Sequence, residues 1–286
     1  HTNNTNKLYI TLISFSTMST AKQNLTKLGS KTEYVDKYDP SLLEPISRSE
    51  RRNGYTAPMN GYDIWTCYEF SFLQSNGYPS SHVIRIVNPA SSEIIFESKS
   101  LKLYLNSFNN TKFNNLNNAL ATVRYDLTKF CGTDIDVFEV DTFLEPKKYM
   151  LYNRATNLDP LSRNFNPIKN YQYNPALLNE GIYRIVSEDQ QIKKSFFTDN
   201  LRSNCEITNQ PDFGRILIQY TTDGFDINPE NLLRYIVSFR NHQEFHEPTC
   251  ERIYNDLFTI LKPKHLLVLC QYTRRGGIDI NPYRQT

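Results

Sequence analysis

The stretch LKLYLNSFNN, residues 101–110, recurs in the second half of the chain as LLRYIVSFRN, residues 232–241. At one constant offset the copies share five of ten residues: Leu101/Leu232, Tyr104/Tyr235, Ser107/Ser238, Phe108/Phe239 and Asn110/Asn241. An Asp-Leu pair follows each copy, at 126–127 and at 256–257, with a slip of one residue. Amphipathic helices also share Leu and Tyr by coincidence, but the identities favour an internal duplication of about 130 residues.

The same order of elements surrounds both copies. In the first half, two alternating apolar stretches predict antiparallel strands joined by a turn, and two helices and a strand follow (63–73, 82–88, 98–109, 114–130 and 134–140). The second half predicts a strand, two helices and a strand (213–221, 228–242, 245–262 and 265–275). We therefore expect an α+β fold of two similar halves, each an antiparallel sheet with two helices, and a ligand site at their interface.

The domain boundaries are expected near residues 145 and 200. Residues 18–145 form the predicted N-terminal domain, 146–200 a polar connecting segment and 201–286 the C-terminal domain. Residues 1–17 are interpreted as a tail or an artificial extension, with the natural start at Met18. Their apolar run is far shorter than the roughly 20 residues of a membrane-spanning helix, and it lacks the flank and cleavage site of a signal peptide.

The composition predicts a soluble globular protein with a small-molecule ligand. Charged residues make up 22% of the chain and the formal net charge is +2, which gives no overall argument for a nucleic-acid or membrane partner. The five cysteines are widely spaced and odd in number. They do not form a disulfide framework, so a reducing cytoplasm is the expected location.

A cysteine and an aspartate stand seven positions apart in the polar stretch RSNCEITNQPDFG, residues 202–214. Cys205 in such a setting is a candidate nucleophile, and Asp212 is a candidate partner for its proton. The alternative is a strand end that carries a cysteine by accident. An apolar setting would raise the pKa of a thiol and make it inert, so the polar neighbours suit a thiol that must ionise.

A second candidate is the pair His246 and Glu247 at an expected helix start. Together they offer a general acid or base and a carboxylate that accepts two ring N–H groups of a guanine-like base. Glu in a first helical turn is also favoured by the helix dipole alone. His246 and Cys250 would share a helix face as zinc ligands, but no further ligand set is evident around them.

Two basic clusters are candidates for phosphate binding. Lys99 and Lys102 follow a Ser-rich helix start, where backbone N–H groups favour anions. The stretch TRRGG, residues 273–277, puts two arginines beside two glycines at a strand end, which allows close approach and charge-assisted contacts. A solvated helix face and a basic turn are the respective structural alternatives.

Taken together, these stretches resemble the NADPH-dependent 7-cyano-7-deazaguanine reductases, the QueF nitrile reductases. The signature of that family matches ESKSLKLYLNSFN at 97–109, and its other blocks match residues 204–214, 232–247 and 272–284. The resemblance runs from about residue 30 to the C-terminus and is to the long form of the family. It implies two tandem tunnelling-fold domains, each an antiparallel sheet with two helices on one face.

The resemblance also implies roles for individual residues. Cys205 corresponds to the nucleophile that forms a covalent thioimide with the nitrile carbon, Asp212 to the proton donor, and His246 to a histidine of the nitrile pocket that takes part in proton transfer. The positions implied to bind the deazapurine are Phe96, Glu97, Ser98, His246 and Glu247, and those implied to hold NADPH are Ser98, Lys99, Arg275 and Gly276. Two NADPH per turnover, a homodimer, no metal and no direct contact with nucleic acid are expected.

Two other functions remain open from the residues alone. A zinc-dependent tunnelling-fold enzyme acting on a pterin or GTP would need a ligand set that the sequence does not display. A deazapurine-binding protein without catalysis would explain the two glutamates, but it gives no reason for Cys205 and Asp212 together.

Overall fold

The computed structural model describes residues 34–141, 152–166, 168, 170–185 and 191–286. Within them, Val35–Thr286 form one compact unit. Its main feature is a mostly antiparallel sheet in the order β6-β3-β2-β13-β12-β10-β9-β7, with β5 beside β2. The bounds are β2 Asn60–Gln74, β3 Pro79–Pro89, β5 Lys112–Phe113, β6 Asp136–Glu139, β7 Thr156–Asn157, β9 Gln191–Asn204, β10 Pro211–Asp223, β12 His265–Tyr272 and β13 Ile278–Gln285.

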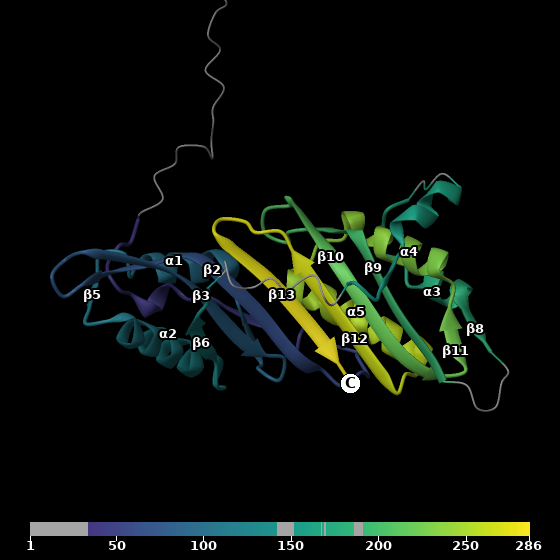
Figure 1. The fold of residues 1–286 in the computed structure, drawn as a ribbon, viewed down its shortest axis with the longest axis horizontal. Helices are drawn as coiled ribbons and strands as arrows, with labels where there is room; N and C mark the ends of the chain where they lie inside the picture. The colour runs from purple at the N-terminus through teal and green to yellow at the C-terminus, as the bar shows by residue number, and fades with distance from the viewer. Residues whose placement is uncertain (1–33, 142–151, 167, 169, 186–190) are drawn as a thin grey trace, which may run out of the picture. The chain divides into compact units, whose positions relative to one another are not determined.

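The last strand, β13, joins the two halves of the chain. It pairs antiparallel with β12 of the second half and, over its whole length from Ile278 to Gln285, with β2 of the first half. In Figure 1 this yellow strand lies between the blue β2 and β12. The sheet is therefore continuous, and residues from both halves meet at the β2–β13 pairing.

Helices α2 (Leu116–Cys131) and α4 (Pro229–Ser238) begin at residues that satisfy one of their first N–H groups. Asn115 caps α2 and Asn228 caps α4, each through its side-chain oxygen, and Pro229 occupies the first turn of α4. At the other end of α2, Gly132 takes the left-handed conformation that ends many helices. The bounds are α1 Ser98–Asn106, α2 Leu116–Cys131, α3 Ala176–Gly181, α4 Pro229–Ser238 and α5 His246–Leu261, with 3-10 turns η1 Pro40–Leu42, η3 Asp159–Asn164 and η4 Phe239–Asn241.

Two apolar cores lie on the same face of the sheet. One packs α4 and α5 against alternate residues of β10 and β12, such as Ile218 and Val268. The other packs α1 and α2 against β2 and β13, where Trp65 and Ile280 are cross-strand partners. Both helix pairs thus cover one face, as the alternation of apolar residues along the strands requires. A smaller cluster around Leu217 and Leu269 lies on the opposite face.

The internal repeat extends to matched hydrogen bonds. The Tyr104 hydroxyl donates to Asp126 at 2.6 Å, and the Tyr235 hydroxyl donates to Asp256 at the same distance. A second tyrosine joins each aspartate, Tyr38 in the first half and Tyr173 in the second. The short pairs β1 (Pro45–Ser47) with β4 (Ile94–Phe96) and β8 (Ile182–Arg184) with β11 (Phe225–Ile227) also correspond.

The expected helices and strands are present, and the expected antiparallel α+β architecture is confirmed. The structure adds elements that the sequence did not indicate, chiefly β9 and β13. Gln191–Asn204 begins inside the segment 146–200 that was expected to be a connection, and α3 and β8 lie there too. The interpretation of residues 1–17 lies outside the described residues.

Candidate active site

A cavity of about 350 Å³ opens between the two halves, a volume within the usual range for small-molecule sites. The first half contributes β2, β4 and the start of α1, and the second half contributes the β9–β10 loop, the start of α5 and the β12–β13 turn. Its lining residues are Trp65, Phe96, Ser98, Lys99, Lys102, Cys205, Thr208, Gln210, Asp212, Phe245, His246, Glu247, Thr273, Arg275, Gly276, Ile278 and Ile280. A cavity therefore exists at the interface where the ligand site was expected.

Cys205 lies in the cavity at the first position after β9. Its N–H donates to the Gln210 carbonyl and its own carbonyl accepts from the Asn209 N–H, both at 2.8 Å. These bonds close a tight loop in which Asn209 has a positive φ of 54°. Cys205 is half-buried, whereas the other four cysteines are buried. Burial raises the pKa of one of those, Cys131, to about 11, so Cys205 is the thiol placed to react.

Asp212, at the start of β10, lines the same cavity as Cys205 and is only 4% exposed. Its Oδ2 lies 3.3 Å from His246 Nε2, and its Oδ1 accepts from the Arg275 guanidinium. Burial alone would raise the pKa of this carboxyl, but hydrogen bonds and charge from His246 and Arg275 outweigh it and hold the pKa below its usual value. Asp212 is therefore a carboxylate at neutral pH, able to accept a proton.

The position of Arg275 follows from the β12–β13 turn. Gly276 and Gly277 both have positive φ, as a two-residue hairpin turn of type I′ requires, and Arg275 and Ile278 exchange backbone hydrogen bonds across them. A side chain at Gly277 would collide with the Glu69 carboxylate. The two glycines thus let the strand reverse close to the cavity and place the Arg275 guanidinium on Asp212.

His246 begins α5 and stacks on Tyr272 of β12, with ring centroids 3.8 Å apart and an interplanar angle of 7°. The stacking fixes the plane of the imidazole, and the contact with Asp212 fixes its Nε2 edge. Its Nδ1 is buried without a hydrogen-bond partner among the described residues. One ring nitrogen therefore faces Asp212, and the other is buried and unpaired within the described part of the chain.

Glu247 is 2% exposed, and burial together with the charge of Asp63 raises its pKa to about 8. Within the described part of the chain, its Oε1 and the Trp65 Nε1 are buried without hydrogen-bond partners, as is the His246 Nδ1. All three residues line the cavity. Buried polar atoms are nearly always paired in native proteins, so these three atoms are candidate contacts for a polar ligand.

Most predicted site residues meet in this cavity, but Glu97 does not line it. Its carboxylate caps α1 instead, accepting from the Ser100 N–H at 2.7 Å. Lys99 is exposed at the cavity and has no ion pair or hydrogen bond among the described residues, whereas Arg275 is already bound to Asp212 and Gln210. The roles of these residues toward a ligand stay predictions.

Several lining residues were not predicted as site residues. Trp65 lies on β2, and its only sequence signal is that it is the single tryptophan of the chain. Phe245 immediately precedes the predicted His246, and this adjacency is a usable signal. The remaining unpredicted lining residues are Thr208, Gln210, Ile278 and Ile280, whereas Lys102 and Thr273 belong to the two basic stretches that were expected to bind phosphate.

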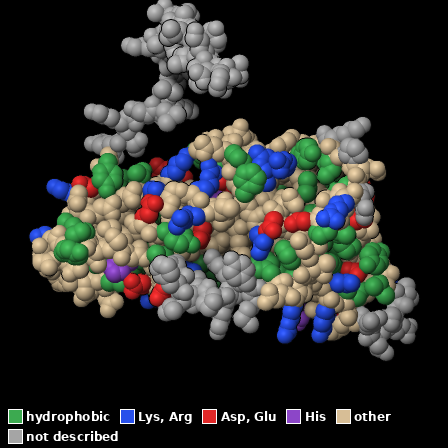
Figure 2. All heavy atoms as spheres, turned by 45° about the horizontal axis from the view of Figure 1, so that its top comes forward, with side chains coloured by type: hydrophobic (Ala, Val, Ile, Leu, Met, Phe, Trp, Pro, Cys, Tyr) green, Lys and Arg blue, Asp and Glu red, His purple; other side chains and the backbone are tan. Residues whose placement is uncertain are grey.

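Charges on the described surface are mixed in sign. Figure 2 shows Lys and Arg side chains next to Asp and Glu side chains across the face in view, in keeping with the formal net charge of +2. Among the residues that the structure describes, no group of three or more His, Cys, Asp or Glu is placed to hold a metal ion. No helix in the described ranges has the length and apolar character needed to cross a membrane.

The fold and the cavity define an α+β protein of two repeated halves, with a ligand pocket between them that contains an accessible thiol. Residues 34–138 match a family described as "Nitrile reductase, 7-cyano-7-deazaguanine-reductase N-term", and residues 211–286 match a family described as "QueF-like protein". The chain is 39% identical over 273 residues to an NADPH-dependent 7-cyano-7-deazaguanine reductase of Hydrogenovibrio crunogenus (strain DSM 25203 / XCL-2), a match that covers 93% of each chain. The chain belongs to the family of the NADPH-dependent 7-cyano-7-deazaguanine reductases.

One solved structure is a more distant match. It is the apo form of the archaeosine synthase QueF-Like, which is 14% identical to this chain. The match covers 35% of this chain and 96% of the other, with a TM-score of 0.31.

Proposed function

We propose that this protein is an NADPH-dependent oxidoreductase that reduces the nitrile of 7-cyano-7-deazaguanine to 7-aminomethyl-7-deazaguanine, in tRNA queuosine biosynthesis. The observation that carries this proposal is the cavity with its half-buried thiol and its three unpartnered atoms, Trp65 Nε1, His246 Nδ1 and Glu247 Oε1. A buried polar group without a partner costs about 1–3 kcal/mol. A purine-like ligand with both donors and acceptors on its edge would remove that cost.

Binding of the deazapurine is assigned to the most buried lining residues, Trp65, Phe96 and Glu247. Glu247, once ionised, accepts N–H groups from the guanine-like edge, and the Trp65 indole donates to an acceptor of the ligand. Phe96 supplies an apolar surface beside Ser98. A carboxylate that accepts two N–H groups discriminates strongly against bases that lack them, because an unpaired buried charge is costly.

The first chemical step joins Cys205 to the nitrile carbon. Asp212 takes the proton from the Cys205 thiol, the thiolate adds to the carbon, and Asp212 returns the proton to the nitrile nitrogen. One S–C bond forms, one π bond of the nitrile breaks, and a covalent thioimide results. The depressed pKa of Asp212 suits the first half of this step, since the group starts as a carboxylate.

The later steps need two hydrides, which NADPH supplies when bound, and two protons. After the first reduction Cys205 leaves as thiolate and an imine remains, and the second reduction gives the amine. His246, held between Asp212 and Tyr272, is placed to pass protons to the substrate nitrogen. The anchoring of the base by Glu247 retains the intermediate while oxidised co-substrate is exchanged for reduced.

The residues at the cavity mouth fit the phosphates of NADPH. Lys99 is exposed and unpaired among the described residues, and it stands in the first turn of α1 at the cavity. Arg275 and Gly276 complete this basic edge. We assign phosphate binding to these side chains and base binding to the most buried lining residues.

The finer architecture is part of the same proposal. The repeated order of strands and helices, with matched Tyr–Asp bonds, supports two tandem tunnelling-fold domains, the first within residues 18–145 and the second including α3, β8 and β9 as well as residues 201–286. A homodimer is proposed on the family resemblance. A cytoplasmic location is proposed because the cysteines are free.

The direct test is NADPH oxidation with 7-cyano-7-deazaguanine, run for the wild type, for Cys205→Ala and for Cys131→Ala, a cysteine outside the cavity. We expect two NADPH oxidised per nitrile, a loss of at least about 10³-fold in kcat for Cys205→Ala, and near-normal kcat for the control. Turnover that survives in Cys205→Ala would rule out the thioimide. Binding of the nitrile without oxidation would indicate a binding protein, and stoichiometric zinc with activity on a pterin or GTP would indicate the other enzyme class.

A further inference from the structure

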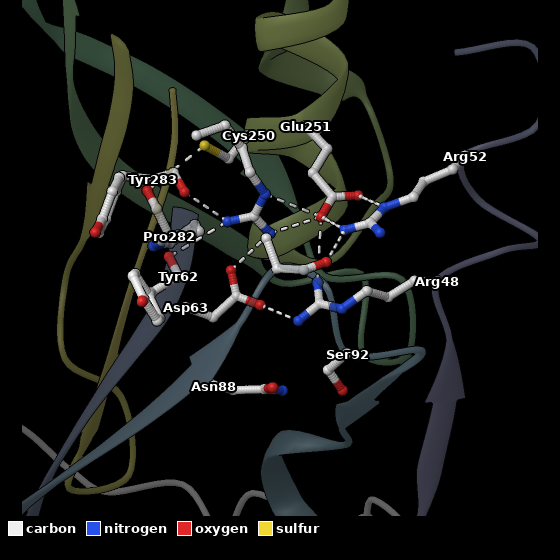
Figure 3. Close-up of polar contacts among 12 residues, drawn as sticks. Arg48, Arg52, Tyr62, Asp63, Asn88, Ser92, Cys250, Glu251, Pro282 and Tyr283 are labelled. Carbon is white, nitrogen blue, oxygen red and sulfur yellow. Dashed lines mark hydrogen bonds and ion pairs between the residues drawn. The ribbon is translucent and has the colours of Figure 1, made fainter. Parts of the chain in front are cut away.

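Residues 48–52, here called the arginine segment, link the first half of the chain to the catalytic elements of the second. Two of its three arginines share one partner. Arg48 is buried and binds Asp63 and Glu251, and Arg52 binds Glu251 through its Nε at 2.8 Å. Figure 3 shows both guanidinium groups converging on the Glu251 carboxylate of α5. The segment is therefore fixed at both ends.

The third arginine reaches the active site. Arg51 binds both carboxylate oxygens of Glu206, at 2.7 and 3.1 Å, and its guanidinium lies 5.1 Å from the centre of the Phe245 ring. Glu206 follows Cys205 directly, and Phe245 precedes His246 directly. One side chain thus contacts the neighbours of two catalytic residues on separate elements.

The loop that carries Cys205 depends on such contacts. Residues 206–210 are exposed, so burial contributes little to their position. Gln243 Nε2 donates to Asn209 Oδ1 at 2.7 Å, and Arg275 binds Gln210. Arg51 provides the third side-chain contact and the only one of these from the first half. A bidentate arginine–carboxylate pair fixes orientation as well as distance.

We propose that Arg51 is a positioning residue. It holds the Cys205 loop and Phe245 in a fixed position relative to each other, and so fixes the orientation of the Cys205 thiol in the cavity. The pair with Glu206 restrains the loop, and the contact with the Phe245 ring restrains the start of α5. Arg48 and Arg52 make this restraint rigid because they bind the buried carboxylate of the same helix. The identity of the reaction that the Cys205 thiol serves rests on the proposed function, whereas the positioning of the thiol by Arg51 is argued from the contacts alone.

The test measures alkylation of Cys205 by iodoacetamide, without substrate, beside NADPH oxidation with the nitrile. The variants are Arg51→Ala, the charge exchange Arg51→Glu with Glu206→Arg, and the control Arg124→Ala, which removes an exposed arginine–aspartate pair on α2. The other four cysteines are buried, so alkylation reports on Cys205. Unfolding midpoints show whether each variant is folded.

For Arg51→Ala we expect alkylation to accelerate roughly threefold or more as the loop is released. We expect kcat to fall about tenfold to a hundredfold with a smaller change in KM. A displacement of a reacting group by about 1 Å can lower the rate about 10²-fold. The charge exchange should restore both rates in part, and Arg124→Ala should match the wild type.

Alkylation and kcat of Arg51→Ala within the range of the control would overturn the proposal, and so would a lower kcat with unchanged alkylation. Altered alkylation in a protein that does not reduce the nitrile would support the positioning role and refute the proposed reaction instead.

Discussion

The carboxyl group of Glu247 lies between the cavity and the buried charges of Asp63, Arg48 and Arg284. Burial and the charge of Asp63 raise its pKa to about 8, against an ordinary value near 4.5, while the two arginines act in the opposite direction. The folded protein therefore holds a proton on Glu247 at pH values where the unfolded chain has lost it.

Because of this difference in pKa, the free energy of unfolding falls as pH rises. The proton on Glu247 contributes stability below about pH 4.5, and that contribution is lost as pH rises through about 8, with a slope of up to about 1.4 kcal/mol per pH unit. We expect the free energy of unfolding of the wild type to fall relative to Glu247→Gln between about pH 5 and pH 8. Urea unfolding of both proteins across this range provides the measurement, and parallel curves would contradict it.

Motif spacing indicated Cys205, Asp212, His246 and Glu247 because their chemistry is visible in the residue types themselves. The same reasoning could not place Glu97, whose carboxylate serves as a helix cap here. It also could not find Trp65, because an indole on an apolar strand is indistinguishable from core until its Nε1 is seen without a partner.

At the scale of elements, the same Tyr–Asp hydrogen bond joins α1 to α2 in the first half and α4 to α5 in the second. The hydroxyls of Tyr104 and Tyr235 are buried and donate to Asp126 and Asp256. The bonded aspartate lies on α2 in one half and on α5 in the other. A hydrogen bond to a charged group is worth about 1.5–3 kcal/mol.

We therefore expect Tyr104→Phe and Tyr235→Phe to lower the free energy of unfolding by about 1–3 kcal/mol each, because either change leaves a mostly buried carboxylate with one donor fewer. The matched control is Tyr125→Phe, which removes a hydroxyl from a tyrosine that is 66% exposed on α2. Urea unfolding at neutral pH measures all three. A cost for Tyr125→Phe equal to the others would show that the repeated bond is not the cause.

Two long strands, β9 and β13, were not predicted from the sequence, for physical reasons. β9 is polar along much of its length, QIKKSFFTDNLRSN, so its alternation is weak. β13 contains Pro282, which argues against a central strand because proline cannot donate to the ladder. The register with β12 covers only Tyr283 to Gln285, so the proline stands where β13 is paired on the β2 side alone.

At the scale of the molecule, a buried ion cluster lies where the two halves meet. Arg284 of β13 binds Asp63 of β2 at 2.7 Å and Glu251 of α5 at 2.6 Å, and Arg48 binds the same two acids. Burial would raise the pKa of Glu251, but the arginines lower it to about 2. Its contribution to stability is present above about pH 4.5 and is lost as pH falls toward about 2.

Removing one acid leaves the arginines uncompensated in the interior. We expect Asp63→Asn to lower the free energy of unfolding by about 3–5 kcal/mol. Asp223→Asn, which breaks an exposed pair with Lys264, should cost about 0–1 kcal/mol. Chemical unfolding of both variants decides this, and equal costs would mean that the cluster is not what stabilises the junction.

The shared strand β13 also determines how the molecule can be taken apart. A chain cut between β6 and β9 would yield two pieces, one ending its sheet at β2 and the other at β13, each with a row of unsatisfied backbone groups. Such pieces would be suited to complementation, in which mixing the fragments restores the strand pairing. Because the cavity is lined from both sides of that pairing, reassembly would restore the active site in the same event.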